Sequence, residues 1–318
     1  MANSYDDCMN IVAPLVLMVV VYGLYLLILY VIYSMCFKRD DRHRALHDIP
    51  PFPQMLERQE EIHKMLDEAA ALPFEGIQVT SFDGLKLHAR YYETTPGAPL
   101  VIQFHGYKGS GLKDFCGGLP FTIKLGYNVI LVDQRAHDQS EGKCMTFGVL
   151  ERKDVISWID YAKQRFGKDI KISLMGISMG AATVLTASNI VPSNVTGILA
   201  DCGFTSASDI IHKVAKDRKL EFLTPLLDRS AKVFAKFDIY KASAEKALRE
   251  CKVPVLFIHG EDDTFVPCEM TLRNYKACAS EKTLLTVKGA DHAMSYFLDH
   301  EAWTSTAKAF LDKTNPIA

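Results

Sequence analysis

The sequence of 318 residues predicts an α/β protein with a mostly parallel central sheet, helices on both faces of it and one transmembrane helix before it. The first observation is that short apolar runs alternate with helical patterns from residue 76 onward. Strands that alternate with helices build a parallel sheet that is covered on both faces. The second observation is a long uncharged stretch near the N-terminus. The remaining residues, roughly 265, have ample length for one large core.

The uncharged stretch runs from Ile11 to Phe37 and has 27 residues. As a helix it is about 40 Å long, which is enough to cross a bilayer with some tilt. A cleaved signal peptide has a shorter apolar core and a basic start, whereas Asp6 and Asp7 precede this stretch. A buried core helix, the other alternative, rarely lacks a polar face over such a length. We therefore expect an N-terminal tail over residues 1–10 and a transmembrane helix over residues 11–37.

Basic residues flank the predicted membrane helix on its C-terminal side only. They are Lys38, Arg39, Arg42 and Arg44. The positive-inside rule then places the large domain in the cytoplasm. We therefore expect a single-pass protein of the plasma membrane, with the lipid bilayer as a partner.

The composition narrows the possible partners further. A net charge of −2 gives no reason to expect nucleic acid binding. The eight cysteines are scattered, with no C-x-x-C pair, which argues against a zinc site and a disulfide scaffold. Unpaired thiols fit a reducing compartment, in agreement with the predicted orientation.

Residues 38–75 are charged and helical in pattern, with a break at Pro50, Pro51 and Pro53. We expect a juxtamembrane helical stalk there, followed by the main domain over residues 76–318.

Eight apolar runs predict the strands of the main domain. They are Gly76–Ser81, Lys86–Tyr92, Leu100–Phe104, Val129–Val132, Ile170–Met175, Gly197–Ala200, Val253–Ile258 and Thr283–Val287. Asp83-Gly84, between the first two runs, is a typical hairpin turn. Helical patterns lie at Phe147–Phe166, Ala181–Asn189, Cys268–Ala279 and His292–Leu311. Ligands bind at the C-terminal ends of the strands of such sheets, so chemically active residues should follow the strands directly.

The most informative motif is Gly176-Ile177-Ser178-Met179-Gly180, which lies between a predicted strand and a predicted helix. A serine at the apex of a sharp strand-to-helix turn has strained backbone angles and tolerates only small neighbours. This requirement explains the glycines two residues to either side, and it makes Ser178 a candidate nucleophile.

Three further motifs follow predicted strands. They are His105-Gly106-Tyr107-Lys108-Gly109-Ser110, His259-Gly260-Glu261-Asp262-Asp263-Thr264-Phe265-Val266-Pro267 and Gly289-Ala290-Asp291-His292. Together with the Ser178 turn, these motifs resemble the α/β-hydrolase fold from about Gly76 onward, and within it the small-cap branch of esterases, lipases and serine aminopeptidases. The order Ser, Asp, His along the chain is the order used in that family.

The resemblance implies a catalytic triad of Ser178, Asp263 and His292. A serine hydroxyl needs a base to take its proton, and the family places that base at His292, which we expect to open the last helix. A carboxylate must orient the imidazole and stabilise its charged form. Asp263 matches the family spacing, and its rivals are Asp262 next to it and Asp201, one strand earlier.

The resemblance also implies an oxyanion hole made by the backbone N–H groups of Tyr107 and Met179, because the tetrahedral intermediate needs two donors. It implies no cofactor and no metal. We interpret His105 and His259 as residues that stabilise turns. The segment 133–142 resembles a structural loop of the family, and His137 and Asp138 within it are candidates for lining the pocket.

The segment from Asp201 to Cys251 lies between the predicted strands Gly197–Ala200 and Val253–Ile258. It corresponds to the insertion that covers the site in this family. We expect a small helical cap within about residues 203–250. Its apolar residues interleave with basic ones, which is typical of a cap helix with its apolar side on the pocket. Contact of the basic face with an anionic membrane surface is the alternative.

A membrane-held hydrolase meets acylated substrates at high effective concentration. We therefore expect a carboxylesterase or lipase that cleaves acyl esters of small molecules or lipids. A serine peptidase of the aminopeptidase-like type is the second hypothesis, and a thioesterase that acts on acylated proteins is the third. A binding protein on an inactive hydrolase fold is the alternative from another class.

Overall fold

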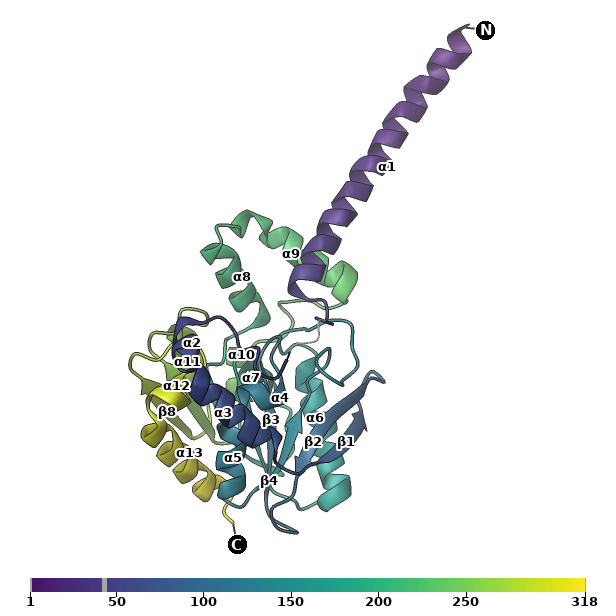
Figure 1. Cartoon of the computed structure of the whole chain (residues 1–318). Helices are drawn as coiled ribbons and strands as arrows, with labels where there is room; N and C mark the ends of the chain where they lie inside the picture. Colours follow the sequence, from purple (N-terminus) through teal and green to yellow (C-terminus); the bar gives the residue numbers. More distant parts are fainter. Residues whose placement is uncertain (1, 42–44, 318) are drawn as a thin grey trace.

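A computed structural model describes residues 2–41 and 45–317 of the chain. A long N-terminal helix, α1 (Ala2–Cys36), stands away from an α/β domain (Figure 1). Because α1 begins at Ala2, residues 2–10 are part of this helix and do not form the separate tail that we expected. Its stretch Val12–Cys36 is long and apolar enough to cross a membrane.

The centre of the domain is an eight-stranded sheet in the order β1-β2-β4-β3-β5-β6-β7-β8. The strands are β1 Glu75–Thr80, β2 Lys86–Tyr92, β3 Leu100–Phe104, β4 Asn128–Val132, β5 Ile172–Ile177, β6 Val195–Asp201, β7 Val255–Gly260 and β8 Lys282–Val287. β2 pairs antiparallel with both β1 and β4, and the other neighbours are parallel. The prediction of a mostly parallel sheet is therefore confirmed.

Helices cover both faces of the sheet. They are α4 Gly111–Asp114, α5 Gly118–Lys124, α6 Glu151–Phe166, α7 Met179–Ala187, α11 Cys268–Ala277, α12 Ser295–Leu298 and α13 His300–Thr314. Successive residues of a strand point to opposite faces, so Ile102 of β3 packs in one core with Trp158 of α6. Its neighbour Val101 packs in the other core with Leu119 of α5 and Phe310 of α13.

The predicted last helix is interrupted. The pattern from His292 to Leu311 forms α12 and then α13, because the carboxylate of Asp299 accepts a hydrogen bond from the Ala302 N–H and caps α13. His292 lies in the turn before both helices. The expectation that it opens the last helix is therefore wrong.

The segment that we expected to be a stalk lies on the domain instead. It forms α2 (Pro53–Glu57) and α3 (Gln59–Ala70), and Ile62, Leu66 and Ala69 of α3 are buried. These residues recur at intervals of three and four, which places them on one helical face. Because that face is apolar, α3 packs against the domain and does not hold it away from the membrane.

The predicted cap region is helical. It contains α8 (Ala207–Asp217), η1 (Glu221–Leu223), α9 (Thr224–Ser230), η2 (Ala231–Ala235) and α10 (Ala244–Leu248). α8 and α9 rise from the domain beside the C-terminal end of α1 (Figure 1). In contrast, α10 packs against α7 and belongs to the core of the domain.

Candidate active site

Ser178 occupies the turn between β5 and α7, with backbone angles φ 55° and ψ −115°. A side chain at Gly180 would place its Cβ 1.8 Å from the carbonyl oxygen of Phe104, and one at Gly176 would lie 2.3 Å from the Gly180 oxygen. Only glycine fits either position, because real Cβ atoms do not approach other atoms so closely. The two glycines therefore permit the sharp turn that presents Ser178 at the end of the sheet.

The structure brings the three predicted triad residues together. His292 Nε2 lies 2.9 Å from Ser178 Oγ, and His292 Nδ1 lies 2.8 Å from Asp263 Oδ2. All three side chains are buried. With Nδ1 donating to the carboxylate, Nε2 is left with a lone pair that can accept the serine proton.

Asp263 is held ionised by its surroundings. Burial alone raises the pKa of a carboxyl group, but hydrogen bonds from His259 and His292 outweigh it and hold the pKa of Asp263 well below its ordinary value. The other oxygen, Oδ1, accepts from the backbone N–H groups of Phe265 and Val266 at 2.9 and 2.7 Å. A carboxylate with this many donors stays charged, which is the state that an orienting acid needs.

His259 contacts the triad carboxylate itself, in addition to the turn that we expected it to stabilise. Its Nε2 lies 3.1 Å from Asp263 Oδ2 and 2.8 Å from the Val266 carbonyl oxygen. Both neighbours are acceptors, so Nε2 carries the proton and donates to them. His259 thus positions the acid of the triad.

The two rival acids lie elsewhere. The Asp201 carboxylate accepts a hydrogen bond from Trp303 Nε1 at 2.8 Å, whereas Asp262 is exposed. The partner that the structure records for His292 Nδ1 is Asp263. Asp263 is therefore the carboxylate in position to orient the imidazole.

The loop after β3 lies against the nucleophile. A Cβ placed on Gly106 would be 3.3 Å from the Cβ of Ser178. Tyr107 follows in this loop, and Met179 begins α7, where the first N–H groups of a helix have no acceptor within it. Both predicted oxyanion donors thus belong to backbone segments beside Ser178.

Two buried histidines hold this loop. His105 Nδ1 lies 2.8 Å from the Gly106 carbonyl oxygen, and its Nε2 accepts from the Gln134 N–H at 3.1 Å. His137 Nε2 accepts from the Lys108 N–H at 3.1 Å. Burial lowers the pKa of His105 to about 4 and that of His137 to about 3, so both rings are neutral and can accept. The turn-stabilising role expected for His105 agrees with these contacts.

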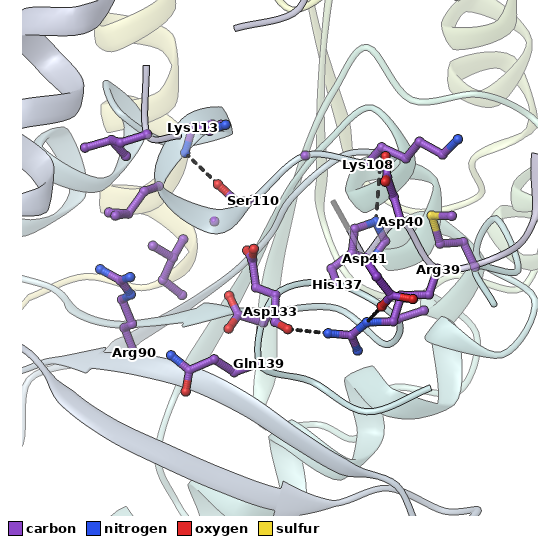
Figure 2. Close-up of a pocket in the computed structure, with 18 residues that line it drawn as sticks. Arg39, Asp40, Asp41, Arg90, Lys108, Ser110, Lys113, Asp133, His137 and Gln139 are labelled. Atoms are coloured by element: carbon purple, nitrogen blue, oxygen red, sulfur yellow. Dashed lines mark hydrogen bonds and ion pairs between the residues drawn. The ribbon is translucent and has the colours of Figure 1, made fainter. Parts of the chain in front are cut away.

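His137 and Asp138, which were candidates for lining the pocket, are not among the residues that line the cavity at Ser178. They line a different cavity of about 500 Å³, together with Arg90 and Asp133 (Figure 2). The ring of His137 faces the oxyanion loop because it accepts the Lys108 N–H. Its role is therefore to hold the loop.

A cavity of about 640 Å³ opens onto Ser178 and His292. Much of its apolar wall comes from the N-terminal segment. These residues are Ile49, Pro50, Pro51, Phe52, Met55 and Ile62. No residue of the predicted cap lines it among those that the structure describes, so the expected cover is supplied by the segment before the sheet.

Phe52 and Gln54 fasten this segment over the catalytic histidine. The ring of Phe52 lies 5.8 Å from that of His292 and 5.9 Å from that of Phe265. Gln54 Nε2 donates to the Gly289 carbonyl oxygen at 2.7 Å, and its Oε1 accepts from the Asp291 N–H at 3.0 Å. The sequence analysis missed both residues. Their one sequence signal is the proline-rich break in the charged segment.

Asp114 is a third residue that was not predicted from the sequence. Its carboxylate lines the catalytic cavity and accepts a hydrogen bond from the Gly106 N–H. Burial raises the pKa of Asp114 to about 6, although the Gly106 hydrogen bond and the nearby His292 lower it in part. Asp114 therefore helps to shape the oxyanion loop.

One group among the described residues has the composition of a metal site. It consists of Cys202, Asp263 and His292, whose ligand atoms lie within 4.8 Å of one another. The Asp263 and His292 atoms are already hydrogen bonded to each other, and burial raises the pKa of the Cys202 thiol far above its ordinary value. A thiol that stays protonated is a poor ligand, so these residues fit a triad better than a metal.

The comparisons with known proteins agree with this fold. A family model described as the alpha/beta hydrolase fold matches residues 99–220. The uncharacterized protein YqkD of Bacillus subtilis is 29% identical over 61% of this chain and 65% of its own length. The lysophosphatidylserine lipase ABHD12 of Danio rerio is 24% identical over 62% of this chain and 52% of its own length.

A solved structure shows the same fold. The Pyrococcus furiosus esterase Pf2001 superposes with a TM-score of 0.64 at 22% identity, over 78% of this chain and 95% of its own. The chain therefore has the α/β-hydrolase fold, and its residues 99–220 match the model of that fold. It spans about two thirds of the length of YqkD and about half of that of ABHD12.

Proposed function

We propose that this protein is a membrane-anchored serine hydrolase that cleaves acyl esters. The observation that carries the proposal is the continuous chain of hydrogen bonds from Ser178 through His292 to Asp263, at the floor of an apolar-walled cavity. The hydrolase fold and the likeness to an esterase structure support this class.

The geometry supports a two-step reaction. His292 Nε2 takes the proton of Ser178 as Oγ attacks the ester carbonyl, and the backbone N–H groups of Tyr107 and Met179 stabilise the oxyanion that forms. The imidazolium then gives its proton to the leaving alkoxide, which departs as an alcohol. Water attacks the acyl-enzyme through the same base and releases the carboxylic acid together with the free serine.

The cavity favours an acyl chain over a polar substituent. Its wall contains proline, phenylalanine, methionine and isoleucine side chains from the N-terminal segment. Each methylene of an acyl chain that is buried against such a wall would contribute about 0.8 kcal/mol to the free energy of binding. The apolar span of α1 would keep the enzyme beside lipid substrates. Both features support a carboxylesterase or lipase.

The peptidase hypothesis rests on one observation. Asp114 is an acidic group on the wall of the catalytic cavity, where it could meet the amine of a peptide substrate. Its carboxylate is already bonded to the Gly106 N–H, so it is less available than a dedicated amine site. We therefore rank a peptidase second and an acyl-protein thioesterase third.

A fluorophosphonate probe tests the enzyme class directly. We expect the probe to label the wild type covalently, the Ser178→Ala variant to lose labelling, and the Ser305→Ala variant, at an exposed serine of α13, to keep it. If the folded wild type were not labelled, the protein would be a binding module on an inactive fold. After labelling, p-nitrophenyl esters of increasing chain length, thioesters and aminoacyl anilides would separate the three substrate classes.

We also propose that α1 anchors the protein in the plasma membrane with the hydrolase domain in the cytoplasm. The basic residues Lys38 and Arg39 after the span support this orientation, while Arg42 and Arg44 lie outside the described residues. A C-terminal reporter that is active only in the cytoplasm is the expected result. Activity only outside the cell would reverse the orientation.

A further inference from the structure

The turn between α8 and α9 exposes apolar side chains. We define residues 216–223 as the cap tip. Phe222 is 73% exposed and Leu220 is 38% exposed, and the basic residues Lys216, Arg218 and Lys219 next to them are also exposed. Outside α1, Phe222 is the most exposed large apolar side chain among the described residues, and with Leu220 beside it the tip offers an apolar surface to an external partner.

The cap is attached to the last turns of α1. Leu29, Tyr33 and Phe37 are buried there, although most of α1 is exposed. Ser230 Oγ donates to the Leu29 carbonyl oxygen at 2.8 Å, and the Phe234 ring lies 5.5 Å from that of Tyr30. These contacts tie the cap to the apolar helix, so a membrane that holds α1 also sets the position of the cap.

The length of the apolar stretch indicates where the contacts between the cap and α1 lie relative to the bilayer. The hydrocarbon core is about 30 Å thick and needs about 20 helical residues. The stretch from residue 11 to residue 37 has 27 residues. Its excess falls at the C-terminal end, because Leu29, Tyr33 and Phe37 there are buried against the protein, whereas most residues before Leu29 are exposed. The contact with the cap therefore lies at the membrane interface.

The cap tip lies on the same side of the domain as this contact. In Figure 1, α9 passes beside the C-terminal part of α1, and the turn that joins α8 to α9 lies at the end of the cap that points away from the sheet. The tip also carries the acidic residues Asp217 and Glu221, so three basic residues outnumber two acidic ones. This excess of cationic side chains beside exposed apolar ones suits a surface of anionic headgroups over acyl chains.

We propose that the cap tip docks on the lipid bilayer, with Leu220 and Phe222 inserted at the interface and Lys216, Arg218 and Lys219 facing lipid phosphates. The proposal rests on the membrane anchoring proposed above. It also places the catalytic cavity next to the lipids, because the Tyr107 hydroxyl, on the cavity wall, donates to the Cys36 carbonyl oxygen at 2.9 Å.

Tryptophan quenching tests the docking in the full chain. The native Trp158 and Trp303 are buried, at 0% and 3% exposure, and give a constant background. The protein is placed in nanodiscs with and without brominated phosphatidylcholine, both containing phosphatidylserine. We expect Phe222→Trp to add fluorescence that brominated lipid quenches at least about twofold. Ile317→Trp, near the C-terminus at the far end of the domain from α1 (Figure 1), should add fluorescence that is not quenched.

A third variant separates the two proposals. Tyr22→Trp lies on the exposed part of α1 and should be quenched if α1 spans the bilayer. Quenching of Tyr22→Trp without quenching of Phe222→Trp would overturn the docking of the cap tip and leave the anchor intact. If neither were quenched, the anchor and the docking would both fail.

An activity measurement gives a second readout. We expect Phe222→Asp to slow hydrolysis of a long-chain ester in phosphatidylserine vesicles at least about fivefold and to leave soluble p-nitrophenyl acetate hydrolysis unchanged. Ile317→Asp is the matched control and should change neither rate. Equal rates for Phe222→Asp and wild type on the vesicles would contradict the proposal.

Discussion

Two regions of the molecule meet at the catalytic cavity, and they are held there by different means. The triad residues follow β5, β7 and β8, so the hydrogen bonds of the sheet set the positions of Ser178, Asp263 and His292. The segment around Phe52 comes from before the sheet and is held by side-chain contacts, such as those of Gln54 with Gly289 and Asp291.

This difference separates chemistry from selectivity. In the proposed mechanism the strand ends carry the groups that move protons, and a parallel sheet brings such ends to one edge regardless of the rest of the chain. The N-terminal segment carries apolar wall residues and no triad member. Changes at the strand ends should therefore abolish the reaction, whereas changes in the segment should alter which substrates react.

The largest effect is expected at the triad acid. Asp263→Asn should lower kcat by about 10⁴-fold, because an amide favours the wrong tautomer of His292 and does not stabilise its charged form. Asp201→Asn should lower it less than about tenfold, since Asp201 is bonded to Trp303. Ester hydrolysis with purified variants measures both, and a larger loss for Asp201→Asn would assign the acid to β6.

The pH dependence of stability tests how the oxyanion loop is held. The pKa of His105 is about 4 in the fold and about 6.5 when unfolded. Between these values the unfolded chain takes up a proton that the folded chain does not, so stability falls as the pH drops through this range. The difference corresponds to about 3 kcal/mol.

The His105→Asn variant removes this ionisation. It should be less stable than the wild type at pH 7.5, but its free energy of unfolding should fall by about 3 kcal/mol less between pH 7.5 and pH 4. Urea unfolding in detergent, followed by tryptophan fluorescence, gives both values. Equal acid sensitivity of the two proteins would show that His105 does not stay neutral in the fold.

A smaller effect is expected in the N-terminal segment. Phe52→Ala removes a ring that lies against His292 and Phe265. We expect kcat/KM for an octanoyl ester to fall about tenfold, since about two methylenes lose their contact, and the value for an acetyl ester to change little. Phe82→Ala, at an exposed phenylalanine outside the cavity, is the control. Equal losses for both esters would mean that Phe52 acts on the chemistry.

The smallest effect is expected where α1 touches the catalytic loop. Tyr107→Phe removes the hydroxyl that donates to the Cys36 carbonyl oxygen and leaves the backbone N–H of residue 107 in place. One such hydrogen bond contributes about 1 kcal/mol, so stability should fall by that amount and kcat by no more than about fivefold. A loss of several hundredfold would show that α1 controls the oxyanion loop.

The sequence predicted the sheet well, and it also predicted three residues that the structure brings together, Ser178, Asp263 and His292, because both depend on local patterns. The G-x-S-x-G turn needs its glycines for contacts within a few residues and with one neighbouring strand. Prediction from the sequence failed where segments far apart in the chain meet. The stalk expected at residues 38–75 lies on the domain. The sequence indicated a structural loop around His137 but not its partner, Lys108, which lies 29 residues away in the chain.

By itself, the sequence determined the fold class, the apolar helix and the residues that meet as Ser178, Asp263 and His292, since strand ends and tight turns have local signatures. The tertiary structure decided which acid faces His292, which segment covers the cavity, and that α1 packs against the cap. These features depend on contacts between side chains far apart in the chain. Such contacts form where packing and hydrogen bonding are satisfied together, and a periodic pattern does not encode them.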